Sequence, residues 1–268
     1  MRSIAIIAGG VFRDSIRDRI GYGLVFFSIM LMASSYLLAQ LTAGQDVKII
    51  KDLGLAAASA IGLFIAVFFG IGLVTKEVER KSIYSLLSKP VTRTQFVLGK
   101  YFGLVLTLLI NLSVMVLAFY AVLLYFEMTT LDGAKAAWEA PALDPRMLKA
   151  FALIGVELMF ITATAIFFST FSSPFLSVAM TFAVYIVGHF GEDLKNLNAI
   201  VQSVVLPYIT KAIYYVMPNL SALDVKSAVV HGLPVSGTSM VLATGSCLVY
   251  IATLLVGAIL IFSRRDLK

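Results

Sequence analysis

Charged residues are scarce in this chain. Asp, Glu, Lys and Arg make up only 13% of its 268 residues, whereas hydrophobic residues make up 60%. An ordinary soluble domain is roughly 25% charged and about 45–50% apolar, and the mean hydropathy here is +0.95. These values exclude a soluble globular domain and are typical of a protein with several membrane spans.

Residues that bind metals or form disulfides are also few. The chain has one cysteine, Cys247, and two histidines, His189 and His231, which are far apart in the sequence. A single cysteine excludes an intrachain disulfide, and these three residues have no metal-ligand spacing. The chain also lacks the pattern G-x-x-x-x-G-K-[ST], whose backbone binds phosphates in many ATPases. We therefore expect no metal or cofactor on this chain, and any ATP-driven work would need a separate ATPase.

The scarcity of charge leaves long apolar runs. A helix needs ~20 mostly apolar residues to cross ~30 Å of hydrocarbon. The run at 150–191 carries only Glu157, with His189 near its end, and it divides at Ser172-Ser173-Pro174 because proline is tolerated in the first turn of a helix. We therefore predict an all-α fold in one transmembrane domain, residues 1–268, with six transmembrane helices. Their expected ranges are 21–41, 54–75, 96–126, 148–171, 174–190 and 239–263.

The remaining segments are assigned to the two sides of the membrane by their charge. Lys and Arg near span ends favour the cytoplasm, and most of the 21 basic residues fall at 1–19, at 76–95 and after 263. This distribution predicts that both termini are cytoplasmic, in a bacterial inner membrane. Because topology explains the pI of about 9.4, we expect no nucleic-acid partner. The expected outer segments are 127–147 and 191–238.

The densest charge lies in the stretch TKEVERKSIYSLLSKPVTR, residues 75–93. Good helix formers occupy 76–87, and Pro90 should end that helix because the residue before a proline avoids the α region. Thr92 and Gln95 then have the spacing of a capping box at the start of the next helix. The stretch is therefore predicted to form a helix, a sharp turn and a second helix on the cytoplasmic side.

Apolar residues lie at the tip of this predicted loop. Leu86 and Leu87 are preceded, one turn earlier, by Ile83 and Tyr84. These side chains could fold back on the cytoplasmic ends of the chain, with the charges simply solvated. They could equally anchor a soluble partner, with the surrounding charges setting its register. The residues alone leave both interpretations open.

Longer blocks of sequence resemble a known family. The block GLVTKEVERKSIYSLLSKPVTRTQFVLGKYFG, residues 72–103, resembles the E-rich loop of ABC-2 type transporter permeases, with its charged helix, its LLS-x-P turn, an Arg and then GK. FRDSIRDR at 12–19 resembles the N-terminal interfacial helix of that family, and MPNLSALDVKSAVVHGLP at 217–234 resembles the segment before its last span. FSRRDLK at 262–268 resembles its basic C-terminal end. The resemblance therefore covers essentially the whole chain.

The resemblance implies a role for the charged loop, predicted at 76–95. It would be a coupling helix that docks in a groove of a separate ABC ATPase subunit, which would bind the ATP, so that this chain would not itself be an enzyme. The functional unit would be two permease copies, most simply a homodimer, with two ATPases, surrounded by membrane lipids. The implied coupling residues are Glu77, Arg80, Lys81, Tyr84, Leu86, Leu87, Pro90 and Arg93.

One acidic residue lies inside a predicted span. Glu157 falls near the middle of the fourth span, where a charge costs ~2.5–3.5 kcal/mol on insertion scales, so it should face protein or water or be protonated. It could be a cavity or gate residue, together with Asn111 of the third span. Alternatively, it could form a structural hydrogen bond, with Asn111 as a candidate partner. Both interpretations stay open.

Three further patterns concern packing and the membrane surface. Residues 1–19 form an amphipathic pattern that predicts an interfacial helix, with Arg side chains reaching lipid headgroups. Gly99 and Gly103 have the G-x-x-x-G spacing that permits close helix packing. Within 191–238, apolar residues recur at helical spacing around Pro207, which predicts short helices in the outer interface that cap an exit path or form a simple lid.

The function that these patterns predict is a permease subunit forming the translocation path of an ATP-driven ABC transporter, expected to be an exporter. The alternative is a membrane anchor that transmits ATP-driven motion to a partner protein and moves no substrate. A passive channel is disfavoured because no ring of charge or selectivity filter is evident. The few polar residues of the spans suit a hydrophobic or lipidic substrate as well as no substrate.

Overall fold

The computed structural model describes residues 2–39, 46–79, 92–135, 138, 140–190 and 217–264. These residues form helices and no strands, in agreement with the predicted all-α fold. The helices are α1 (Arg2–Ile16), α2 (Arg19–Ala39), α3 (Asp46–Glu79), α5 (Arg93–Thr129), α6 (Asp132–Lys135), α7 (Met147–Ser169), α8 (Pro174–His189), η1 (Ser221–Leu223), α11 (Lys226–Val230) and α12 (Gly237–Arg264).

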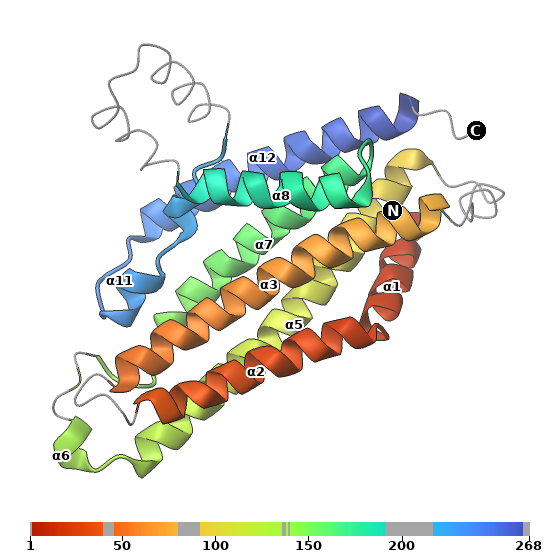
Figure 1. Cartoon of the computed structure of the whole chain (residues 1–268). Coiled ribbons are helices and arrows are strands. Elements are labelled where there is room, and N and C mark those ends of the chain that lie inside the picture. Colours follow the sequence, from red (N-terminus) through yellow and green to blue (C-terminus); the bar gives the residue numbers. More distant parts are fainter. Residues whose placement is uncertain are drawn as a thin grey trace, which may run out of the picture.

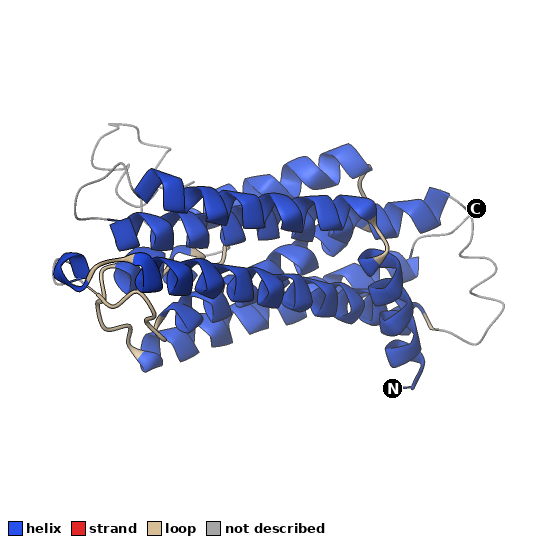
Figure 2. Cartoon of the chain, turned by 90° about the horizontal axis from the view of Figure 1, so that it is seen from below, coloured by secondary structure: helices blue, strands red, loops and turns tan. Residues whose placement is uncertain are grey.

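The long helices lie side by side in one bundle (Figure 1, Figure 2). Helices α3 and α7 are central, with 78% and 72% of their most apolar segments buried, whereas α2 and α12 bury only 28%. Helix α3 packs against α2, α5, α7 and α8, and α7 packs against α12. The apolar side chains that α2 and α12 leave exposed are the surface expected to face lipid.

Five helices of the described residues are long and apolar enough to cross a membrane, namely α2, α3, α5, α7 and α12. Helix α8 begins with Pro174 in its first turn, as predicted, but it has 16 residues. At 1.5 Å per residue it is about 24 Å long, which is less than the ~30 Å thickness of the hydrocarbon core. An all-α protein with several membrane helices is confirmed, whereas the sixth span remains a prediction.

Helix α3 differs from the predicted second span. The sequence predicts a span that ends at 75 and a separate loop from 76, yet α3 continues without a break to Glu79. No proline interrupts this stretch, and Lys, Glu and Val continue a helix more easily than they begin a new one, because nucleation is the costly step. The first charged residues of the predicted loop therefore extend a membrane helix beyond its apolar part.

Helix α1 lies across the end of the bundle where α12 also ends (Figure 1, Figure 2). It packs against α5 at Gly99 and Gly103. A Cβ atom at Gly99 would lie 2.7 Å from Cβ of Ile7, and one at Gly103 would lie 2.7 Å from the carbonyl oxygen of Ala8. The predicted close packing at this glycine pair is confirmed, and its partner is the N-terminal helix.

Candidate functional site

Most of the predicted coupling residues lie outside the described residues. Arg80, Lys81, Tyr84, Leu86, Leu87 and Pro90 fall in the segment 80–91, and Glu77 is described only as part of the α3 backbone. Arg93 is the member of the set whose side chain can be placed. The local structure therefore begins where the loop enters α5.

The entry into α5 is the predicted capping box. The backbone N–H of Gln95 donates to Oγ1 of Thr92 at 3.3 Å, and the backbone N–H of Thr92 donates to Oε1 of Gln95 at 3.2 Å. These two bonds satisfy N–H groups that a helix start leaves without partners. The cap determines where the loop ends and α5 begins, and it places Arg93 in the first turn.

Arg93 connects the start of α5 to the end of α12. Its guanidinium donates to the carbonyl oxygens of Phe262 at 2.9 Å and Ser263 at 2.8 Å. The last carbonyls of a helix lack intrahelical partners and carry its partial negative charge, so a cation is favourable there. Arg93 therefore acts as a C-terminal cap for α12, a contact that the sequence does not predict because it joins residues 169 and 170 positions apart.

Aromatic stacking strengthens the same contact. The rings of Phe96 and Phe262 are stacked with centroids 5.6 Å apart, and the ammonium of Lys100 lies 4.6 Å from the centroid of Phe96. Lys100 is almost completely buried. We call Arg93, Phe96, Phe262 and Ser263 the α5–α12 junction, and the first turns of α5 carry both this junction and the glycine face that holds α1.

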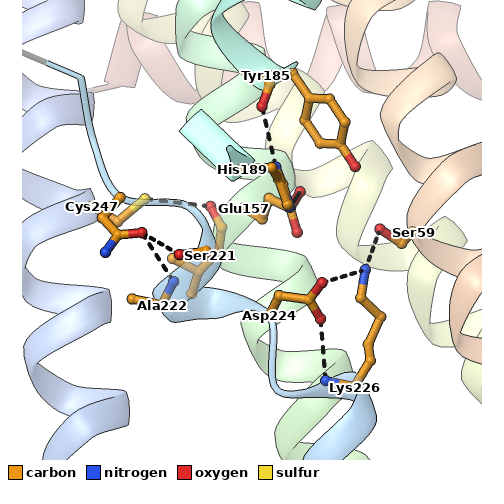
Figure 3. A network of polar contacts seen from close by, with 11 residues as sticks. Ser59, Glu157, Tyr185, His189, Ser221, Ala222, Asp224, Lys226 and Cys247 are labelled. Carbon is orange, nitrogen blue, oxygen red and sulfur yellow. Dashed lines mark hydrogen bonds and ion pairs between the residues drawn. The ribbon is translucent and has the colours of Figure 1, made fainter. Parts of the chain in front are cut away.

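A second group of polar residues lies within the bundle, and Figure 3 shows it. Glu157 of α7 is 2% exposed, and its Oε1 lies 3.4 Å from Nε2 of His189 in α8. The other ring nitrogen of His189, Nδ1, lies 3.2 Å from the carbonyl oxygen of Tyr185 one turn earlier. The buried carboxyl group therefore faces the end of α8.

The structure corrects one suggested partner of Glu157. The contact is with His189 and not with Asn111, which is half-buried on α5. The face of α7 toward α5 is formed by Gly155, whose Cβ would lie 3.4 Å from Leu112. Residues two apart on a helix point about 200° apart, so Glu157 points away from α5. Whether either residue lines a path stays a prediction.

The outer segment contributes to the same region. The ammonium of Lys226 donates to Oγ of Ser59 in α3 at 3.2 Å and lies 3.6 Å from Oδ2 of Asp224. We call Ser59, Glu157, His189, Asp224 and Lys226 the polar cluster. The segment before α12, which resembles the family's segment before its last span, is thus tied to α3 by a hydrogen bond from the charged Lys226.

Sequence reasoning also missed a buried lysine. Lys51 is 1% exposed, and its ammonium donates to the carbonyl oxygen of Pro141 at 2.7 Å. Nearby, Tyr120 donates to the carbonyl oxygen of Asp144, which is itself buried. The only signal in the sequence was a lysine within the first turns of α3. The two hydrogen bonds hold the segment before α7, which contains Pro141 and Asp144, against α3 and α5.

The hydroxyl groups of the spans mostly bond to their own helices. Thr107 donates to Gly103, Thr162 to Leu158 and Thr164 to Phe160, each to a carbonyl oxygen four residues earlier. Within the part of the chain that the structure describes, no group of His, Cys, Asp and Glu is arranged to hold a metal ion. The three threonine hydroxyl groups are therefore satisfied by the backbone of their own helices.

Comparison with known proteins agrees with the helical bundle. No curated protein matches the chain. A family model described as "ABC-2 family transporter protein" matches residues 5–267, which is nearly the whole sequence. The match bears out the resemblance drawn from the loop, the N-terminal helix and the C-terminal end, and it supports an ABC ATPase as the general kind of partner. The chain belongs to the ABC-2 family of transporter proteins and is a multi-pass membrane protein with the role of a transport permease.

Proposed function

We propose that the chain is the permease subunit of an ABC exporter in a bacterial inner membrane. Two copies form the translocation path, and a separate cytoplasmic ATPase binds and hydrolyses the ATP. Family membership supports the transport role and an ABC ATPase as partner. The export direction, the homodimer and the coupling to the ATPase go beyond family membership, and we propose them here.

The observation that carries the coupling proposal is the α5–α12 junction. Helix α5 begins directly after the charged loop, and in its first turn Arg93 holds the last carbonyls of α12. Two turns later, Gly99 and Gly103 hold α1. A movement of the loop would therefore shift α5, and α12 and α1 would move with it because both are in close contact with α5.

The position of the chain ends supports the proposed orientation. The first residues of α1, the end of α12 and the charged end of α3 lie at the same end of the bundle (Figure 1). This end carries the basic residues that favour the cytoplasm. We infer that this end of the bundle is the cytoplasmic end, where an ATPase can reach it.

A second candidate function has an observation in its favour. The threonines of α5 and α7 bond to their own backbone, which leaves few polar groups for a hydrophilic substrate. This suits a hydrophobic or lipidic substrate, and it also suits a membrane anchor that transmits ATP-driven motion and moves no substrate. Reconstitution with the ATPase separates the two, since only the exporter moves a compound across the vesicle membrane.

The docking loop gives the first test. Leu87→Ala should weaken the association of the ATPase with the permease by roughly tenfold or more. Burying a leucine side chain is worth ~1.5–3 kcal/mol, truncating an interface hot spot often costs at least about 2 kcal/mol, and each 1.4 kcal/mol is about tenfold. The measurement is co-purification of the two chains from membranes, with the amount of permease held equal.

A charge variant serves as the comparison. Glu77→Lys should also weaken association, but its effect should shrink with added salt because exposed charges are screened over about 10 Å at 0.1 M. The Leu87→Ala effect should persist at both salt concentrations. If both variants retain the ATPase fully and membrane function is intact, the loop is a solvated connector and the docking proposal is wrong.

The polar cluster gives a second test. Glu157→Gln keeps the shape and hydrogen-bonding capacity of the side chain that faces His189 and removes its charge. We expect normal insertion and assembly with a several-fold change in the ATP hydrolysis rate of the reconstituted complex, because an ionisable group inside a membrane bundle commonly marks a functional path. Glu127→Gln removes a carboxylate outside the cluster and should leave the rate unchanged. An unaltered rate in Glu157→Gln would leave Glu157 with only a structural role.

A further inference from the structure

Helix α1 has a second face that the bundle does not cover. An open groove of about 710 Å³ runs along it, and its described lining is Ile6, Gly9, Gly10, Phe12, Arg13, Ile16 and Arg17. The opposite face of α1 is the one that packs on α5 through Ile7, Ala8 and Val11. The groove is therefore a surface of α1 that remains available after the bundle has formed.

The floor of the groove is kept open by two glycines. A Cβ atom at Gly9 or Gly10 would meet no described residue within 4 Å, in contrast to Gly99 and Gly103, where the neighbouring helix occupies that space. Glycine is among the least favourable residues inside a helix. Close packing among the described residues does not require these two glycines, and they leave room along the helix for a ligand.

The chemistry of the groove is apolar along its length and cationic at one end. Ile6 is 70% exposed and Ile16 is 36% exposed. Arg17 directly follows α1, and its backbone N–H donates to the carbonyl oxygen of Arg13 at 3.3 Å, so the two residues are one helical turn apart on the same side, and both are exposed. Neither guanidinium has an ion-pair partner among the described residues, and none of the described residues that line the groove is acidic.

The groove also adjoins the lipid-facing surface of the bundle. It ends at Arg17, and α2 begins at Arg19. Tyr22 and Phe26 near the start of α2 are 61% and 64% exposed, as expected for a membrane helix in contact with acyl chains. The end of the groove that carries Arg13 and Arg17 is thus followed directly by a helix whose exposed apolar side chains are expected to face lipid, which favours a lipid over a soluble protein.

We propose that this groove is a binding site for one anionic phospholipid per chain. Arg13 and Arg17 bind its phosphate, since a guanidinium donates two parallel hydrogen bonds to phosphate oxygens. One acyl chain lies over Gly10 and Gly9 toward Ile6, and the other extends from the arginines past Ile16 toward the start of α2. The site is separate from the polar cluster, and it does not depend on the direction of transport.

The test uses the purified full chain in a neutral detergent. Native mass spectrometry with dioctanoyl phosphatidylglycerol should show one preferred adduct, bound at least about tenfold more tightly than dioctanoyl phosphatidylcholine. Each basic side chain near a membrane surface contributes about fivefold to anionic binding, so two arginines together exceed tenfold. The double variant Arg13→Gln with Arg17→Gln should bind both lipids equally. The matched control, Lys48→Gln with Lys149→Gln, removes the same charge elsewhere and should keep the preference.

A second variant separates lipid binding from folding. Gly10→Leu fills the groove where the structure has open space, and leucine is a better helix former than glycine. Its Tm should be unchanged or higher, while phosphatidylglycerol binding should fall at least about tenfold, as expected when a bulky side chain occupies the site. Equal binding of the two lipids by the unaltered chain would overturn the proposal, as would full retention in either variant. If inorganic phosphate competes as strongly as the lipid, the groove is a phosphate site and not a lipid site. If either variant loses the ATPase and keeps lipid binding, the groove is a contact for the ATPase instead.

Discussion

Gly103→Leu is expected to destabilise the bundle by about 3 kcal/mol, at the upper end of the usual range for overpacking. A side chain at this position meets the carbonyl oxygen of Ala8 at 2.7 Å and Cβ of Val11 at 2.7 Å. A backbone carbonyl cannot move aside as the end of a flexible side chain can, so α1 as a whole must shift away from α5. For a chain of this size, the loss corresponds to a Tm lower by roughly 6–12 °C, measured on the protein in detergent.

The matched control is Gly23→Leu. Gly23 lies on α2, where a Cβ atom would meet nothing within 4 Å, so the same substitution adds a side chain without a collision. Its Tm should stay within about 1–2 °C of the starting protein, as for surface changes within about ±0.5 kcal/mol. An equal loss in both variants would mean that leucine is harmful in these helices generally and that the contact of α1 with α5 is not responsible.

Arg93→Ala is expected to separate binding of the ATPase from the stimulation of its ATP hydrolysis by the permease. The variant removes both hydrogen bonds from the guanidinium to Phe262 and Ser263, and bonds from a charged donor contribute about 1.5–3 kcal/mol each. Under the proposed function, the ATPase should stay bound and hydrolyse ATP, while the stimulation of hydrolysis by the reconstituted permease falls about tenfold or more. Arg93→Lys should recover only part of it, since one ammonium does not reproduce the planar fork of a guanidinium.

A second arginine provides the control for this experiment. Arg146 also donates to a carbonyl oxygen, that of Gly232, which precedes the other end of α12. Arg146→Ala removes a bond of the same kind away from the charged loop and should change stability more than coupling. Loss of coupling in Arg146→Ala, with none in Arg93→Ala, would contradict the transmission of movement through the α5–α12 junction.

The sequence by itself determined the helical character of the chain and several helix starts. Inside a membrane, the backbone N–H and C=O groups of an apolar run have no water to bond, so they must bond within the segment. Composition alone therefore predicts helices. Local signals were equally reliable, since the capping box of Thr92 with Gln95 and the proline that opens α8 depend on residues a few positions apart. The extent of α3 was misjudged because a change from apolar to charged residues marks a membrane boundary and need not end a helix.

The tertiary structure alone decided which helix faces meet. A membrane helix is apolar on every side, so its sequence does not show which side is covered. The glycine pair predicted close packing, but only the fold showed that the partner is α1. The contacts of Arg93 with the end of α12, of Glu157 with His189 and of Lys51 with Pro141 join residues far apart in the chain. Such pairs depend on how the helices are turned about their axes, which is set by packing within the whole bundle.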